Sequence, residues 1–434
     1  MEKIDKTYEI DDFNRTNADT KWESSNALLT YLYKEYHHNW PYPNYVLLVG
    51  DYPTMPSILV TGPQQKYYSD YGYSMLGEEI TWSDYEYNSW PQFKDPWPHF
   101  DLARLPVDTG ANCAIVFDKI LQYDRNSLSS DYYDNTLLLG YFEDKQKPNC
   151  TSDSTYMTIV PHIHDFFDSS AVSRPVETVL TTDYECESEN YLPRTVDLPN
   201  GRSIDSPLRY NKDADYFLAN DTSDPDHSNV RDQIKDIINN YGVGLVFHRD
   251  HGAGNDVHWD QPKFYISDAL GLTNLTDGFL PVVFSINCST GVFARWNHNT
   301  NDHENANSIT EAFLESPTGG AVAVISPTKQ TNSDPNNLLV QGALDSLWEE
   351  YSGSSDKNPK KKLGQMFNDM KIYLENYNGR NKQTWQHQLK YHLYGDPEME
   401  VRLTRPLVEG GTELEIQMGE KILTTDPKSF YIEI

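Results

Sequence analysis

Short apolar runs alternate along the chain with amphipathic stretches. Continuous apolar runs that stop at Gly, Asp or His are typical of strands buried on both faces of a parallel sheet. Apolar residues spaced three or four apart are typical of helices. The alternation predicts an α/β fold with a mainly parallel sheet and flanking helices. The predicted strands cover residues 45–51, 99–107, 135–144, 176–183, 243–247, 280–287 and 319–326, and the predicted helices cover residues 24–36, 113–125, 154–167 (interrupted by Pro161), 230–241, 308–316, 336–351 and 362–377.

Two long polar stretches do not fit this alternation. Residues 65–100 are rich in Tyr, Trp, Asp and Pro, and we predict a long ordered loop there. Residues 184–228 are rich in Asn, Asp and Pro. Because so long a stretch without regular structure is usually functional or mobile, we interpret residues 184–228 as an insertion or flap.

Charge and composition narrow the classes of partner. The formal net charge of −30 makes nucleic acid a poor partner, since phosphate binding needs a basic surface. The same acidity favours solubility, cationic ligands and calcium. No apolar run is long enough to cross a bilayer, and the first residues, MEKIDKTYEIDDF, lack the apolar core of a secretory signal. The four cysteines are too few for a disulfide scaffold but allow one special thiol; they are Cys113, Cys150, Cys186 and Cys288.

Chemistry-bearing residues follow two of the predicted strands. The stretch GVGLVFHRDHG ends with His251 and Gly252, and the stretch LPVVFSINCST contains Cys288 after its apolar part. Ligands of parallel sheets bind outside the carboxyl ends of the strands, so Cys288 and His251 are a candidate nucleophile and base. Small polar residues after Cys288 leave room for a substrate, although a buried, inert cysteine remains an alternative.

A metal site is the rival interpretation of the same stretch. Zinc is held by histidine, cysteine and carboxylate ligands, and the pattern H-x-D-H supplies several of them within a few residues. The signal is short, and no second ligand cluster of matching quality exists, His392 being the best outlying residue. The candidate zinc ligands are His248, Asp250, His251 and His258, with Cys288 as a further one.

The order of these motifs resembles the gingipain family of the caspase–legumain–gingipain clan of cysteine peptidases. An apolar block ending in His-Gly is followed, some thirty-odd residues later, by one ending in Cys. The resemblance extends from about residue 25 to 404 and is carried by five stretches in order: YVLLVGD (45–51), HFDLARLPV to FDKILQYDR (99–125), DHGAGNDVHW (250–259), GGAVAVIS (319–326) and LYGDPEMEVRL (393–403).

The resemblance implies a role for each residue of the site. Cys288 is expected as the nucleophile, and His251 as the base that later protonates the leaving amine. The backbone N–H groups of Gly252 and Cys288 are expected to form the oxyanion hole. The family orients its histidine with an acid after an earlier strand, where Glu143 falls, with Asp144 as the nearby alternative.

Substrate preference is also implied by the resemblance. The family cleaves after a basic P1 residue because a buried acid pairs with Arg or Lys. Asp153 corresponds to the acid of Arg-specific members, and Asp334 falls near that of Lys-specific members, so Arg is favoured over Lys. Asp153 also suits a helix N-cap. Trp259 matches a family tryptophan after an insertion of two residues and is predicted to contribute to substrate binding.

The family architecture implies a caspase-like three-layer α/β sandwich in two subdomains. We place an N-terminal α/β subdomain at residues 1–135, the catalytic subdomain at 136–404 and a β-rich tail at 405–434, similar to the start of an immunoglobulin-like module. Structural calcium, no organic cofactor, and secretion or surface attachment are further expectations from the resemblance. An inactive relative that binds calcium or proteins remains an alternative. Self-cleavage within or beside residues 184–228 is a further hypothesis, because that region carries Arg194, Arg202 and Arg209.

Overall fold

The computed structural model describes most of the chain. The described residues are 21–38, 42–52, 54–61, 66–76, 97–125, 131–145, 155–169, 172–183, 194–197, 203–206, 216–218, 228–252, 258–297, 302–305, 307–352, 362–403 and 429–432.

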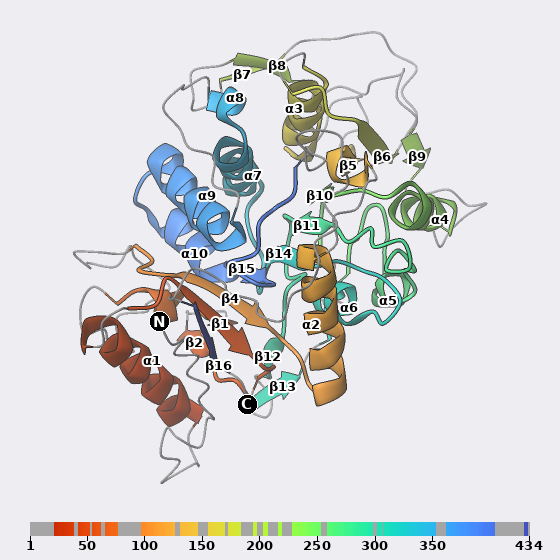
Figure 1. Cartoon of the computed structure of the whole chain (residues 1–434). Coiled ribbons are helices and arrows are strands. Elements are labelled where there is room, and N and C mark those ends of the chain that lie inside the picture. Colours follow the sequence, from red (N-terminus) through yellow and green to blue (C-terminus); the bar gives the residue numbers. More distant parts are fainter. Residues whose placement is uncertain are drawn as a thin grey trace, which may run out of the picture.

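A ten-stranded sheet forms the centre of the molecule (Figure 1). Its strand order is β16-β1-β4-β15-β14-β11-β10-β5-β6-β9, and every pair is parallel except β14 with β15. The predicted mainly parallel α/β sheet is therefore confirmed. The strands are β1 Tyr45–Val49, β4 Asp101–Leu105, β5 Thr136–Phe142, β6 Val176–Thr182, β9 Tyr216–Leu218, β10 Leu245–Arg249, β11 Val282–Ser285, β14 Ala323–Pro327, β15 Tyr391–Tyr394 and β16 Ser429–Ile432.

Helices cover both faces of this sheet. In Figure 1, α3, α7, α9 and α10 gather on one side, and α2, α4, α5 and α6 on the other. Such coverage explains why β1, β5, β10, β11 and β14 are buried along their whole length. The helices are α1 Lys21–His38, α2 Gly110–Arg125, α3 Tyr156–Asp168, α4 Ser228–Asp236, α5 Ile266–Leu270, α6 Ile309–Glu315, α7 Ser333–Leu347, α8 Glu349–Ser352, α9 Leu363–Asn378 and α10 Lys382–Lys390. Short 3-10 helices are η2 Tyr71–Ser74 and η4 Asp131–Asp134, and the π-helical segment η5 Ile237–Tyr241 follows α4.

Several sequence expectations need correction. The helix α3 is not interrupted, because it continues through Pro161. The polar stretch 184–228 is not wholly irregular, since it contains the antiparallel hairpin β7 (Arg194–Asp197) and β8 (Ser203–Ser206) as well as β9. The predicted loop 65–100 contains β3 (Lys66–Ser69), which pairs with β2 (Ile58–Thr61). A third hairpin joins β12 (Ala294–Asn297) to β13 (Asp302–Asn305).

The predicted β-rich tail contributes to the main sheet. Its described strand, β16, pairs in parallel with β1 from Tyr45 to Leu48. The division at residues 135 and 136 stays a prediction: a separate apolar cluster is built mostly from residues 28–100, but Trp385 and Leu389 of α10 complete it.

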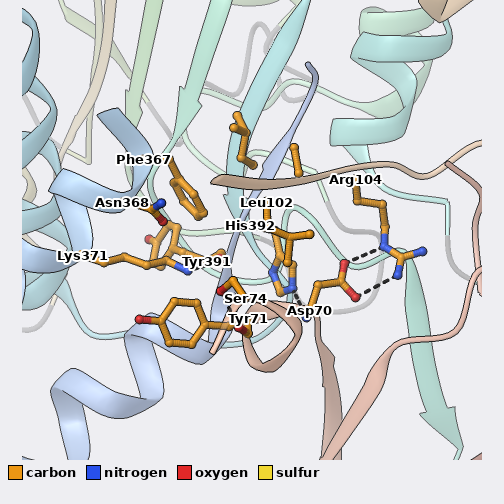
Figure 2. Close-up of a pocket in the computed structure, with 12 residues that line it drawn as sticks. Asp70, Tyr71, Ser74, Leu102, Arg104, Phe367, Asn368, Lys371, Tyr391 and His392 are labelled. Atoms are coloured by element: carbon orange, nitrogen blue, oxygen red, sulfur yellow. Dashed lines mark hydrogen bonds and ion pairs between the residues drawn. The ribbon is translucent and has the colours of Figure 1, made fainter. Parts of the chain in front are cut away.

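A buried polar cluster joins β4 and the residue after β3 to β15 and the end of α10 (Figure 2). The Arg104 guanidinium of β4 donates to both carboxylate oxygens of Asp70, at 2.6 and 2.8 Å. The Asp70 main-chain N–H donates to Nε2 of His392 at 2.9 Å, and His392 Nδ1 lies 2.9 Å from the Lys390 carbonyl. The imidazole must therefore be neutral, and burial lowers the pKa of His392 to about 4.

Acid should destabilise the fold partly through this imidazole. An unfolded histidine takes up its proton near pH 6.5, whereas folded His392 stays neutral down to about pH 4. The unfolded chain thus binds more protons in this window, and stability falls as the pH drops through it, by at most about 1.4 kcal/mol per pH unit from this residue. We expect His392→Gln to flatten the dependence of the free energy of unfolding on pH between 4 and 6.5, measured by urea denaturation.

The matched control is His164→Gln, because the His164 side chain is 44% exposed and its pKa is raised, not lowered, by Asp165. This control should not flatten the profile. Equal slopes in wild type and His392→Gln would contradict the assignment of a neutral buried imidazole.

Candidate active site

The predicted nucleophile and base emerge from neighbouring parallel strands. His248 of β10 pairs with Ser285 of β11, and the Ile286 N–H donates to the His248 carbonyl at 3.1 Å. Beyond the strands the two chains stay in contact. A Cβ placed on Gly252 would lie only 1.7 Å from the Cys288 carbonyl oxygen. A glycine is therefore required at residue 252, and it brings the segment with His251 against the backbone of Cys288.

The imidazole of His251 has polar partners on two sides. Its Nε2 lies 3.2 Å from Oε1 of Glu143, which directly follows β5. The hydroxyl of Tyr156, the first residue of α3, lies 3.0 Å from Nδ1 and 3.3 Å from Nε2 of His251. The His251 side chain is 40% exposed and that of Glu143 is 17% exposed. The structure thus brings Glu143 to His251, whereas Asp144 is buried, and its main-chain N–H donates to the Asp183 carboxylate at 2.9 Å.

The Cys288 side chain is half-buried against the loop that follows β14. The Thr331 N–H donates to the sulfur at 3.4 Å, and the thiol lies 3.6 Å from the Thr331 carbonyl oxygen. Ser289 adopts a φ of 56°, in the left-handed region that non-glycine residues rarely occupy, and its N–H donates to the Lys329 carbonyl at 3.2 Å. After this sharp turn the chain runs beside the end of β14, where the Gly291 N–H donates to the Pro327 carbonyl at 2.9 Å.

Sequence reasoning missed Arg249, the last residue of β10. It is fully buried. Its guanidinium donates to the Ile286 carbonyl at 2.8 Å, the Ser333 carbonyl at 3.2 Å and the Asn337 side chain at 3.1 Å. The same guanidinium lies 5.2 Å from the ring centroid of Tyr156. Arg249 therefore ties β10 to the residues before Cys288 and to α7, and an arginine directly after the buried run Leu245–His248 was the signal for this role.

The four candidate zinc ligands do not gather into one site, although His248 Nε2 and Asp250 Oδ2 lie 3.9 Å apart. His248 is fully buried and stacks on Trp259 at 4.3 Å between ring centroids. Its Nδ1 accepts from the Asn287 amide at 2.7 Å, and burial holds the pKa of His248 well below its usual value. Burial raises the pKa of Asp250 well above its usual value, and its carboxylate accepts from the Gln261 N–H. Within the described residues, no three His, Cys, Asp or Glu side chains form a group that could hold a metal ion.

Comparison with known proteins decides the family. Residues 3–402 match the sequence profile described as Peptidase family C25. The chain belongs to peptidase family C25. This is a family of cysteine peptidases, so its members act on polypeptides.

Solved structures agree on the fold of this C25 chain. It resembles the Arg specific cysteine proteinase gingipain R (RgpB), with a TM-score of 0.60, 17% identity, and coverage of 88% of this chain and 70% of that one. It also resembles a complex of Porphyromonas gingivalis RgpB pro- and mature domains, with a TM-score of 0.60, 16% identity, and coverage of 92% and 73%. No curated protein matches. Among the described residues, no helix is long and apolar enough to span a membrane.

Within this C25 fold, the residues predicted to set specificity fall in different surroundings. Asp153 lies outside the described residues, as do Arg202 and Arg209. Asp334 is exposed in the first turn of α7. Trp259 is fully buried, and its Nε1 donates to the Ser285 hydroxyl at 2.8 Å. Such burial argues against direct contact with a substrate and favours support of the β10–β11 junction.

Proposed function

We propose that the chain is a cysteine endopeptidase in which Cys288 is the nucleophile, His251 the general base and acid, and Glu143 the residue that orients His251. The observation that carries the proposal is the 3.2 Å contact between His251 and Glu143. Both residues lie at the carboxyl edge of the sheet. His251 directly precedes Gly252, whose backbone packs closely against that of Cys288. A base held by a third group beside a thiol is the arrangement that nucleophilic catalysis needs.

The proposed reaction follows from these positions. Because Nε2 is bonded to Glu143, we assign Nδ1 of His251, which the Tyr156 hydroxyl contacts at 3.0 Å, as the nitrogen that accepts the thiol proton. The sulfur of Cys288 then attacks the peptide carbonyl carbon, and the backbone N–H groups of Gly252 and Cys288 stabilise the oxyanion. The C–N bond breaks as His251 gives its proton to the leaving amine. Water, deprotonated by His251, attacks the thioester carbon, and the C–S bond breaks to release the acid and restore the thiol.

We further propose a basic P1 residue, with Arg favoured over Lys. One solved relative is described as Arg specific. An Arg side chain needs a carboxylate placed for bidentate pairing. Asp153 is the proposed pocket acid, since exposed Asp334 is the less suitable of the two, lacking the burial that strengthens such a pair.

Hydrolysis of fluorogenic peptides that differ only in P1 residue tests the function. We expect cleavage after Arg, weaker cleavage after Lys, and none after Asp or Asn. Asp153→Asn should lower kcat/KM for the Arg peptide by about 100-fold, since a charge-assisted pair is lost. Asp334→Asn is the matched control and should leave it unchanged. A loss of activity in Asp334→Asn and none in Asp153→Asn would instead identify Asp334 of α7 as the pocket acid. A folded chain that cleaves none of the peptides would favour an inactive relative.

Calcium stays a prediction from the resemblance. The described residues offer no carboxylate cluster that fits the ion, and part of the acid-rich turn after Ser69 lies outside the described residues. A rise in thermal midpoint on adding calcium to chelator-treated protein would support a structural ion. Secretion or surface attachment likewise remains a proposal.

Replacing Glu143 tests the orienting role. Glu143→Gln keeps a hydrogen-bonding side chain but removes the charge that favours the imidazolium. Because a charge-assisted hydrogen bond contributes about 1.5–3 kcal/mol, we expect kcat to fall by roughly 10- to 100-fold with little change in KM. Steady-state kinetics on the best peptide measure both. Asp144→Asn is the matched control, and an equal loss of kcat there would contradict the assignment of Glu143.

A further inference from the structure

The loop that holds the Cys288 sulfur is itself held by a buried lysine. Lys390, the last residue of α10, is 2% exposed, and its Nζ donates to the Gln330 carbonyl at 2.6 Å. The Lys390 carbonyl in turn accepts from the Thr328 N–H at 2.9 Å. A buried ammonium is costly unless it serves a specific interaction, and nothing in the proposed reaction uses this one.

The carbonyl that Lys390 contacts belongs to the same peptide group that contacts the sulfur. The Gln330 C=O and the Thr331 N–H are the two ends of one planar unit. Lys390 approaches the oxygen end, and the nitrogen end donates to Cys288 Sγ at 3.4 Å. A positive charge at a carbonyl oxygen polarises the peptide and strengthens the hydrogen bond made by its N–H.

We infer that Lys390 is a positioning residue that stabilises the Cys288 thiolate through the Gln330–Thr331 peptide. The inference rests on the proposed role of Cys288 as nucleophile. Neighbouring contacts keep the peptide in place, since the Thr331 hydroxyl donates to the Asn287 carbonyl at 2.5 Å. The Asn332 N–H donates to Nε2 of His387 at 3.0 Å.

The charge on Lys390 is itself sensitive to pH. Burial lowers the pKa of Lys390 to about 8, and the negative charge of Cys288 opposes that shift. Below this pH the ammonium supports the thiolate, and above it the support fades. The titratable groups around Lys390 are Lys382 and His387 on α10, Lys329 after β14, Cys288 after β11 and Tyr67 on β3.

The rate of alkylation of Cys288 by iodoacetamide, measured across pH on the full chain, tests the inference. Mass spectrometry would follow the Cys288 peptide. In Lys390→Met and Lys390→Gln we expect the profile midpoint to rise by about one pH unit, because both lack the charge. Lys390→Arg keeps a cation and should restore most of the wild-type profile. Lys329→Met is the matched control, because it removes a neighbouring positive charge whose side chain has no described hydrogen bond to the Gln330–Thr331 peptide. We expect it to shift the midpoint of the alkylation profile clearly less.

Two results would overturn the inference: an unshifted profile in both neutral Lys390 variants, or a Lys329→Met shift as large as that of Lys390→Met. The Gln and Arg variants keep the test valid if the Met variant does not fold. Failure of the proposed function would be a separate result. If the wild type cleaves no peptide, the proposed peptidase activity is contradicted, but the alkylation rates of wild type and variants can still be compared.

Discussion

Replacing Cys288 by Ala should lower peptide hydrolysis by about 10⁴-fold or more, and His251→Ala should cost nearly as much. A nucleophile and its base act as a unit, so removing either leaves only substrate binding and oxyanion stabilisation. The double variant should therefore be no slower than either single one. Initial rates on the best fluorogenic peptide, at matched folded concentration, measure all three.

The same variants separate the thiol mechanism from the metal alternative. Hydrolysis that survives in Cys288→Ala and disappears on adding EDTA would contradict the thiol mechanism and support a zinc hydrolase. Cys113→Ala is the matched control, because Cys113 is the other described cysteine and lies in α2, packed against the core. Its activity should equal that of wild type.

Gly252→Ala should lower kcat/KM by about 100-fold or more. The new methyl carbon would lie 1.7 Å from the Cys288 carbonyl oxygen, and both partners are backbone, so no side chain can rotate away. The segments that carry His251 and Cys288 must separate, and a displacement of about 1 Å at a catalytic site costs about that factor. Thermal unfolding should show a lowered midpoint, since the β10–β11 junction is disturbed as well.

Gly110→Ala provides the comparison, because a Cβ there would meet nothing within 4 Å. That variant should keep both activity and thermal midpoint. Wild-type kinetics in Gly252→Ala would show that the contact between residue 252 and Cys288 is not needed for catalysis.

The fold was predictable from the sequence where burial on both faces of the sheet requires a continuous run of apolar residues. Strands such as β5 and β14 are covered by helices on both faces, so their sequences are continuous apolar runs. The helix α10 was not predicted, because its sequence KQTWQHQLK is mostly polar. Its Gln388 and Lys390 are nevertheless buried, and they donate hydrogen bonds to the distant Lys371 and Gln330 carbonyls, which a local pattern does not contain.

The candidate site was predictable from the sequence to the extent that its residues follow the ends of strands. His251, Cys288 and Glu143 each follow a parallel strand, and topology alone brings such residues to one edge. The roles of Arg249 and Lys390 depend on partners 37 and 60 residues away in sequence, Ile286 and Gln330. Contacts of that kind are set by tertiary packing, which explains why spacing and composition did not indicate them.

The position of β16 at the edge of the sheet also affects the tendency of the protein to aggregate. Unpaired N–H and C=O groups along an outer strand recruit strands from other chains. Within the described part of the chain, β16 covers β1 and the opposite edge is β9, so the two outer strands have only 4 and 3 residues. A strand from another molecule that adds to the described main sheet would therefore pair with one of these short edges, on a molecule whose formal charge of −30 repels its own copies.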